Sequence, residues 1–140
     1  METNDTTHFI SLQKTYDEGI EAIFNLFMDG TVFKLTGADH IQSDFKAGGL
    51  FRLMFNNRGA IHGQFIKINK THIIIEWNAD GFQRHSEIKT LVEITLSGGN
   101  GKCILTLDHK NIKQEDSASA KKRAWTEILD NIEKTISNNR

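Results

Sequence analysis

The sequence has no proline among its 140 residues, so its turns must be formed by other residue types. Glycine, asparagine and aspartate adopt the backbone conformations of tight turns most readily. Clusters of these residues therefore mark the expected turns of the chain. The turns are expected at Lys46-Ala47-Gly48-Gly49, Asn56-Asn57-Arg58-Gly59, Asn69-Lys70, Asp80-Gly81 and Ser97-Gly98-Gly99-Asn100-Gly101.

The chain also lacks cysteine pairs, long apolar runs and an excess of either charge. Its one cysteine, Cys103, cannot form an internal disulfide, which suits a reducing compartment. No apolar run reaches the length of a membrane span, and the polar first residues do not resemble a signal peptide. The net charge is −1 at pH 7, so electrostatics gives no reason to expect nucleic acid or membrane binding. We therefore expect a cytoplasmic protein that binds neither.

Length and composition indicate one globular domain over residues 1–140. A chain of this length has room for a sizeable core, and its 38% hydrophobic and 25% charged residues are ordinary for a soluble domain. The polar ends, residues 1–7 and 137–140, are expected to be flexible.

The most regular pattern in the sequence is an amphipathic helix at residues 117–136. Its apolar residues recur at helical spacing and leave charged residues on the other side, which predicts one broad buried stripe. The stripe consists of Ala118, Ala124, Trp125, Ile128, Leu129, Ile132 and Ile136. Such a helix needs an apolar surface to cover.

The start of the chain predicts a strand and one or two short helices. Residues 8–16 alternate in polarity, which is typical of a strand. Thr15 and Glu18 have the spacing of a capping box ahead of a helix. The apolar residues of that helix are Ile20, Ile23, Phe24, Phe27 and Met28. Residues 31–35 are expected to add a further short helical turn.

Six more strands are expected between the turns, at residues 41–45, 50–55, 60–68, 72–78, 85–96 and 102–109. Short strands separated by turn signals are typical of an antiparallel meander. With the first strand this makes about seven, and the fold class is α+β: a curved antiparallel sheet closed by the C-terminal helix.

Alternation assigns the faces of these strands. In residues 85–96, one face is expected to hold Ile88, Thr90, Val92, Ile94 and Leu96. In residues 102–109, the buried face is expected to hold Cys103, Leu105, Leu107 and His109. The face of residues 60–68 that carries His62, Gln64, Ile66 and Ile68 points inward or outward depending on whether the strand contains a bulge.

Two features suggest chemistry but have simpler explanations. Gly48-Gly49 resembles part of a phosphate-binding loop, yet such loops lead into a helix, whereas a strand is expected here. A glycine turn between strands is the simpler interpretation. Cys103 shares a face with Leu105 and Leu107, which favours a buried small side chain over a nucleophile.

The six histidines do not have the spacing of a metal site. No pair lies at i, i+2 on an expected strand or at i, i+4 on a helix. Only convergence across strands would bring together His62, His72, His85 and His109. We therefore expect no bound metal.

Carboxylates on the expected strands are the remaining candidates for acid–base catalysis. They are Glu76, Glu87, Glu93 and Asp108. Three of them fall on solvent-facing sides, and none shows the spacing of a catalytic pair. We therefore predict no catalytic residue and no cofactor.

Four local strings stand in the order strand, helix, six strands, long helix. They are Ile23-Phe24-Asn25-Leu26-Phe27-Met28-Asp29; Asp44-Phe45-Lys46-Ala47-Gly48-Gly49-Leu50-Phe51-Arg52; Gly63-Gln64-Phe65-Ile66-Lys67-Ile68 with Ile75-Glu76-Trp77; and Leu105-Thr106-Leu107-Asp108-His109 followed by Trp125. Together they resemble the helix-grip, or START-like (SRPBCC), superfamily. The resembled branch is named for the activator of the heat-shock protein 90 ATPase and is of its C-terminal-domain type. Four departures from its pattern, which leave the fold unchanged but reshape the cavity, are Phe24, Leu35, Asn69-Lys70 and Ala124.

The resemblance implies a non-enzymatic domain that binds a small hydrophobic ligand in a cavity between the sheet and the C-terminal helix. The expected wall residues are Phe51, Phe65, Trp77, Thr90, Val92 and Trp125. The competing interpretation is that these side chains only fill the core.

The resemblance also implies two alternatives. The first is an interaction domain that acts on the heat-shock protein 90 ATPase. The family's founding members carry a separate chaperone-binding domain for which this length leaves no room, so full activation is not expected. The second is a cyclase- or hydrolase-like enzyme, ranked last because no acid–base pair is visible. The chain is expected to be a monomer or a homodimer formed through a strand edge.

Overall fold

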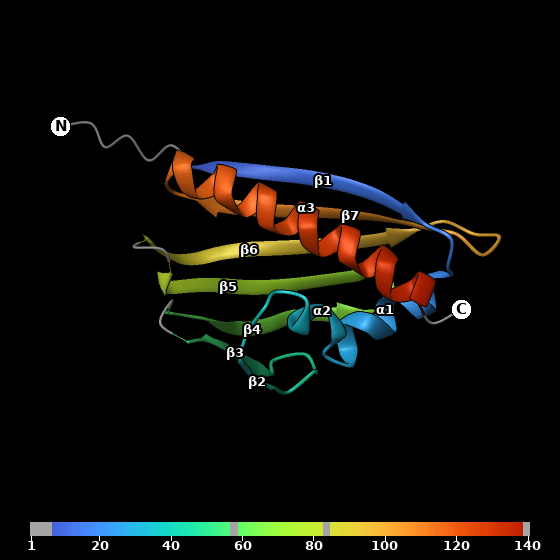
Figure 1. Cartoon of the computed structure of the whole chain (residues 1–140), viewed down its shortest axis with the longest axis horizontal. Helices are drawn as coiled ribbons and strands as arrows, with labels where there is room; N and C mark the ends of the chain where they lie inside the picture. Colours follow the sequence, from blue (N-terminus) through green and yellow to red (C-terminus); the bar gives the residue numbers. More distant parts are fainter. Residues whose placement is uncertain (1–6, 57–58, 83–84, 139–140) are drawn as a thin grey trace.

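The computed structural model describes residues 7–56, 59–82 and 85–138, and its centre is one antiparallel sheet of seven strands (Figure 1). Neighbouring strands follow the order β1-β7-β6-β5-β4-β3-β2. In chain order the elements are β1 (His8–Tyr16), α1 (Ile20–Met28), α2 (Thr31–Lys34), β2 (His40–Ser43), β3 (Leu50–Phe55), β4 (Gly59–Asn69), β5 (His72–Phe82), β6 (His85–Ser97), β7 (Cys103–Ile112) and α3 (Glu115–Asn138). The predicted α+β meander with a long C-terminal helix is confirmed.

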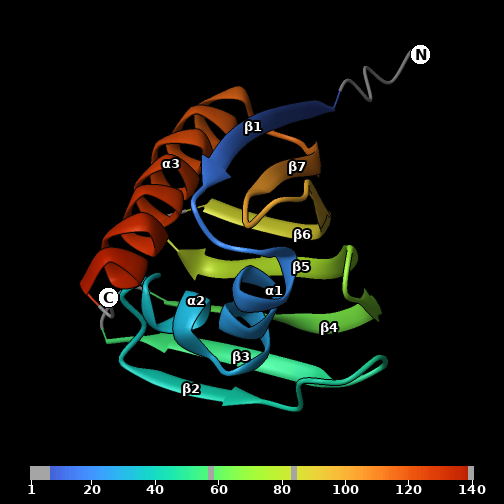
Figure 2. The same ribbon diagram turned by 90° about the vertical axis from the view of Figure 1, so that its right-hand side faces the viewer.

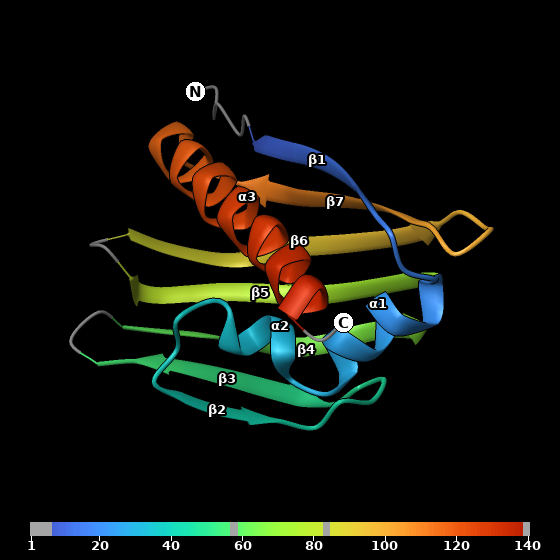
Figure 3. The ribbon, with the colours of Figure 1, turned by 45° about the vertical axis from the view of Figure 1, so that its right-hand side comes forward.

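All three helices lie on the concave face of the curved sheet, as Figure 2 shows. Helix α3 crosses that face diagonally, while α1 and α2 cover the part nearer β3 and β4 (Figure 3). The reason is the alternation of the strands, which puts their apolar residues on this face. The inner residues of β5, β6 and β7 are buried: Ile73, Ile75, Trp77, Thr90, Val92, Ile94, Leu96, Cys103, Leu105, Leu107 and His109.

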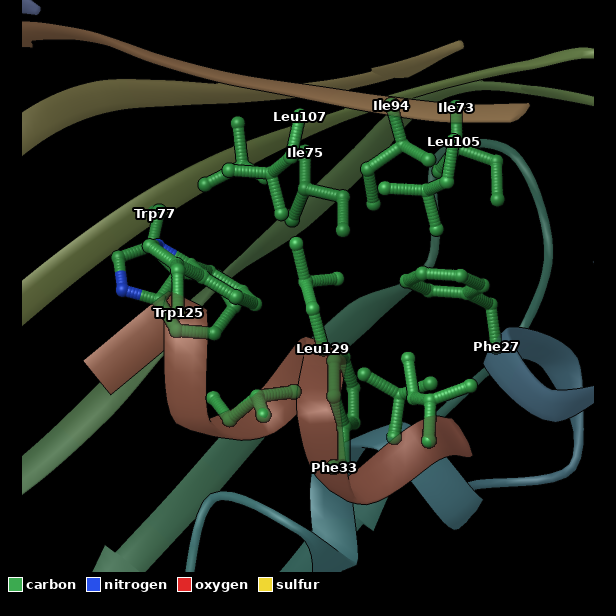
Figure 4. Packing of buried hydrophobic residues seen from close by; sticks show 14 of the residues in the cluster. Phe27, Phe33, Ile73, Ile75, Trp77, Ile94, Leu105, Leu107, Trp125 and Leu129 are labelled. Atoms are coloured by element: carbon green, nitrogen blue, oxygen red, sulfur yellow. The ribbon is translucent and has the colours of Figure 1, made fainter. Parts of the chain in front are cut away.

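Helix α3 extends two residues beyond the predicted helix at each end, to Glu115 and Asn138. Its first turn carries Glu115 and Asp116, whose negative charges suit the positive end of the helix dipole. The buried side consists of Ser117, Ala118, Trp125, Ile128, Leu129 and Ile132. Most of the predicted stripe therefore packs on the sheet, as Trp125 and Leu129 do in Figure 4, whereas Ala124 is exposed and Ile136 is half-buried.

The capping box predicted at Thr15 and Glu18 is wrong. β1 continues to Tyr16, and α1 begins at Ile20 with Gly19 at its N-cap and no side-chain cap. The strand persists because Thr15 pairs with Ile104 and because the buried Tyr16 hydroxyl donates a hydrogen bond to the Leu129 carbonyl at 2.8 Å.

The predicted inward position of Ile88 is also wrong. Trp77 pairs with Thr90 and Ala79 pairs with Glu87, so Asn78 faces two residues of β6. This bulge is held by the Asn78 side-chain oxygen, which accepts the backbone N–H of Lys89 at 2.5 Å. Because a bulge reverses the alternation, Ile88 is 56% exposed.

Asp80-Gly81 was expected to form a turn, but both residues lie inside β5, which continues to Phe82. The register shifts between Ala79 and Phe82, so a sequence with turn propensity forms a strand irregularity instead. The predicted turn at residues 56–59 includes residues 57–58, which lie outside the described residues.

A bulge also settles the orientation of β4. Phe65 pairs with Ile75 and Lys67 with Ile74, so Ile66 is the extra residue. Before it, His62 and Gln64 face outward; after it, Ile68 turns inward and packs against the core.

The described part of the chain contains no helix that is long and apolar enough to cross a membrane. Of the ends expected to be flexible, residues 1–6 and 139–140 lie outside the described residues. Ser137 and Asn138 belong to the last turn of α3.

The bulge in β6 predicts a large loss of stability on truncation of one isoleucine of this strand and almost none on truncation of another. Ile94 is completely buried, so Ile94→Ala should lower the free energy of unfolding by about 2–5 kcal/mol. Ile88→Ala is the matched control and should change it by less than about 0.5 kcal/mol. Urea denaturation measures both, and a large loss at Ile88 would contradict the bulge.

Candidate functional site

An aromatic cluster lies under α3 on the inner face of β3, β4 and β5. The ring centroids of Phe51 and Trp77 are 5.5 Å apart, and those of Phe33 and Phe51 are 5.1 Å apart. Phe51 and Trp77 come from different strands and are both paired with Gly63 between them. A side chain at Gly63 would collide with the Glu76 carbonyl and meet the Phe51 ring at 3.0 Å. Glycine at this position therefore lets the two rings meet across β4.

Trp125 of α3 packs on this cluster and begins a chain of buried hydrogen bonds. Its ring packs against that of Trp77 (Figure 4), and the two ring centroids are 5.1 Å apart. The Trp125 indole N–H donates to His109 Nδ1 at 3.0 Å. His109 Nε2 lies 2.9 Å from the Thr90 hydroxyl, which donates to the backbone carbonyl of Trp77. The network therefore joins α3, β7, β6 and β5.

These bonds require a neutral His109. Because Nδ1 accepts from Trp125, the ring proton lies on Nε2 and is donated to Thr90. A second proton on Nδ1 would point at the indole N–H. Burial, together with the positive charge of Lys121, lowers the pKa of His109 to about 3. His109 is thus a structural group and not a proton donor at neutral pH.

A pocket of about 380 Å³ opens between the first half of α3, the ends of β3, β4 and β5, and the loop after α2. Its apolar walls are Phe55, Ile61, Trp77, Ala79, Ala120, Ala124, Trp125 and Ile128. Its polar residues are Thr36, Ser117, Lys121, Arg123 and Glu127. The volume lies at the lower end of the range of ligand pockets, roughly 300–1,000 Å³, and the composition is also typical of them.

Of the six predicted wall residues, Trp77 and Trp125 line this pocket. The other four are buried but do not line it. Phe51 and Phe65 belong to the aromatic cluster, Thr90 to the hydrogen-bond network, and Val92 to the core. Contact of any of the six with a ligand stays a prediction.

Sequence reasoning missed the polar residues of the pocket. Ser117, Lys121 and Trp125 follow one another at intervals of one helical turn, so they lie on the same side of α3. This spacing could have identified Ser117 and Lys121 as pocket residues from the sequence. They were overlooked because both are polar, whereas the buried stripe was defined by its apolar residues.

The other candidate sites give no convergent chemistry. His62 is exposed on β4, His72 contacts Glu93, and His109 is buried, while the side chain of His85 lies outside the described residues. Within residues 7–56, 59–82 and 85–138, no group of three His, Cys, Asp or Glu residues is placed to hold a metal ion. Burial raises the pKa of Cys103, which disfavours the reactive thiolate.

The carboxylates that were candidates for acid–base catalysis do not form a catalytic pair among the described residues. Glu93 accepts hydrogen bonds from Lys110 at 2.6 Å and from His72 at 2.5 Å, and these two groups lower its pKa. It therefore stays ionised, as a structural ion pair does. The side chain of Glu87 lies outside the described residues. A more open hollow of about 530 Å³ lies at β2, β3 and β4, with Arg52, His62 and Asp80 among its lining residues.

Trp125→Ala should lower the free energy of unfolding by about 3–5 kcal/mol, because the buried indole packs between helix and sheet and supplies the donor to His109. Thermal or urea denaturation measures the loss. A loss below about 1 kcal/mol would contradict the packing of α3 described above.

The low pKa of His109 predicts a specific acid sensitivity. In the unfolded chain the imidazole binds a proton below its ordinary pKa of 6.5, whereas in the folded chain it stays neutral down to about pH 3. Its contribution to stability is therefore complete above pH 6.5 and is lost, by about 1.4 kcal/mol per pH unit, as the pH falls toward 3.

His109→Gln should lose stability at pH 7 but show a shallower decline between pH 6 and pH 4, measured by urea denaturation at each pH. His40→Gln, at an exposed position on β2, is the control and should keep the wild-type decline. Equal declines in all three proteins would contradict the neutral, buried imidazole.

The fold resembles those of known proteins. A crystal structure of an HSP90 activator from Plasmodium falciparum is 26% identical with a TM-score of 0.75, and the match covers 92% of this chain and 96% of that one. The Aha1 dimer from Colwellia psychrerythraea is 15% identical with a TM-score of 0.73, covering 90% and 93%. CalU16 from Micromonospora echinospora is 18% identical with a TM-score of 0.69, covering 89% and 73%. The last two similarities show the fold alone.

No curated protein matches the chain in sequence. The family model described as "Activator of Hsp90 ATPase homolog 1-like protein" matches residues 19–137, from the N-cap of α1 to the last turn of α3. The match therefore includes strands β2 to β7, the hydrogen-bond network and the pocket, and it leaves out β1. The chain belongs to the Activator of Hsp90 ATPase homolog 1-like protein family, within the START-like helix-grip superfamily.

Proposed function

We propose that this chain is a non-enzymatic binding domain that holds a small hydrophobic ligand between α3 and the sheet. The observation that carries the proposal is the pocket of about 380 Å³, whose walls are largely apolar and include both tryptophans of the chain. An apolar pocket with a few polar groups at one side is the usual form of a small-molecule site. Of the predicted wall residues outside it, Phe51 contacts the Trp77 ring, and Phe65 packs on Phe51.

An enzymatic role has less support. Glu127 is the one carboxylate that lines the pocket, and the nearby His109 is buried, hydrogen-bonded at both ring nitrogens and low in pKa. Acid–base catalysis needs a group that reaches the substrate and titrates near the working pH. We propose a cytoplasmic location, which suits the unpaired, buried Cys103.

The second candidate function is association with the heat-shock protein 90 ATPase, and with it a role in the stress response. It is supported by the 26% identity to an HSP90 activator along nearly the whole length of both chains. Co-precipitation with the chaperone, and a change in its ATPase rate on addition of this chain, test the idea. Absence of both effects would refute it. A homodimer is a related proposal, supported by the fold shared with the Aha1 dimer.

Ligand binding should be visible in the intrinsic fluorescence, because Trp77 and Trp125 are the only tryptophans and both line the pocket. Among fatty acids, flavonoids and aromatic acids, at least one class should shift the emission and raise the melting temperature. At a ligand concentration of 100 Kd the stabilisation is about 2.7 kcal/mol.

Two variants of α3 locate the site. Ala120→Phe places a ring in the pocket and should abolish the shift, whereas Ser119→Phe, at an exposed position outside the lining, should preserve it. Unchanged fluorescence and melting temperature with every compound would refute ligand binding. Binding that survives Ala120→Phe would place the ligand elsewhere.

A further inference from the structure

We propose that the ligand of the α3 pocket is an amphipathic anion, with an apolar body against the two tryptophans and a carboxylate head at Lys121. The proposal rests on the proposed function, because it concerns the occupant of the same pocket. It goes further by naming the charge of the ligand, its orientation and the residue that recognises it.

The pocket is divided by polarity in a way that fixes an orientation. The strands contribute apolar wall residues, such as Phe55 and Ile61, while the cations of the lining, Lys121 and Arg123, both belong to α3. A neutral hydrophobic ligand uses only the apolar walls, which the strands and the apolar residues of α3, such as Trp125, form together, and leaves the cations without a partner in the ligand. A ligand with one polar end satisfies both sides at once.

Lys121 is held at the buried side of its helix and does not simply extend into solvent. Its ammonium donates to the Ser117 hydroxyl at 2.8 Å, and Ser117 is only 3% exposed. The hydroxyl therefore fixes the position of the charge beside the pocket before a ligand arrives.

The field of Lys121 reaches the interior. Its positive charge contributes, after burial, to the low pKa of His109, which is completely buried beneath Trp125. A positive charge in this position favours an anion placed next to the indoles. The same charge opposes a cationic ligand.

The other charged residues of the pocket lining also favour an anionic ligand. Arg123 is the second cation, and it forms no ion pair with any described residue; Glu127 is the one carboxylate. The balance at the polar side is positive. The volume of about 380 Å³ suits a single small head group on a short apolar body, and a carboxylate meets both conditions.

The test compares octanoate, octan-1-ol and octylammonium, which share an apolar body and differ in the head group. Titration of the intact chain at pH 7.5, followed by tryptophan fluorescence and calorimetry, should give at least tenfold tighter binding of octanoate than of the alcohol, with octylammonium weakest. The preference for octanoate should shrink as sodium chloride is raised, because salt screens the charge.

Lys121→Met should weaken octanoate at least tenfold and leave octan-1-ol unchanged. Lys122→Met is the matched control, since Lys122 is the exposed neighbour on α3 and does not line the pocket, and it should bind both ligands as the wild type does. Lys121→Arg keeps the charge and should retain most of the preference. If Lys121→Met does not fold, the effect of sodium chloride on the wild-type preference for octanoate still tests whether a positive charge of the protein attracts the ligand.

The outcomes separate this proposal from the proposed function. Equal affinity for octanoate and octan-1-ol, stronger binding of octylammonium, or a preference that persists in Lys121→Met overturns the anionic ligand and leaves a hydrophobic pocket. No binding of any of the three overturns this proposal, and the proposed function too if the broader panel also fails.

Discussion

The chain of hydrogen bonds from Trp125 through His109 and Thr90 to the Trp77 carbonyl is the interaction on which the rest of the structure depends. Apolar packing alone holds a helix on a sheet but does not select one position along it. A buried polar network selects one position of the helix, because all its donors and acceptors find partners only there. It fixes α3 relative to three strands, and so it fixes which residues face the pocket.

The diagonal course of α3 explains where the apolar pocket lies. Toward its C-terminus the helix meets the sheet where Tyr16 bonds to the Leu129 carbonyl and Lys14 pairs with Asp130 at 2.7 Å. Toward its N-terminus it diverges from β3 and β4, and the surface between them is left to the pocket. One helix thus supplies both the closure of the core and the polar side of the candidate site.

Periodicity predicted the elements well because the buried and exposed residues alternate cleanly over most of the sheet. It failed where the backbone breaks the alternation: Ile88 beside the β6 bulge, and Asp80-Gly81 inside β5. Bulges depend on partners far along the chain, such as the Asn78 side chain that holds Lys89, so local patterns do not reveal them. For the site, both indoles were among the wall residues expected from the family resemblance, whereas Lys121 required knowledge of which side of α3 faces the opening.

The pairing of β1 with β7 has a kinetic consequence. Residues His8–Tyr16 leave the ribosome before the other strands of this sheet, yet their partner is Cys103–Ile112, and α3 packs on β1 only afterwards. The sheet therefore cannot be completed until nearly the whole chain has been synthesised. Contacts so distant in sequence carry a large loop-closure cost, which slows folding. During that interval β1 and the inner face of the meander are unprotected, and this is when the newly made chain is most exposed to aggregation.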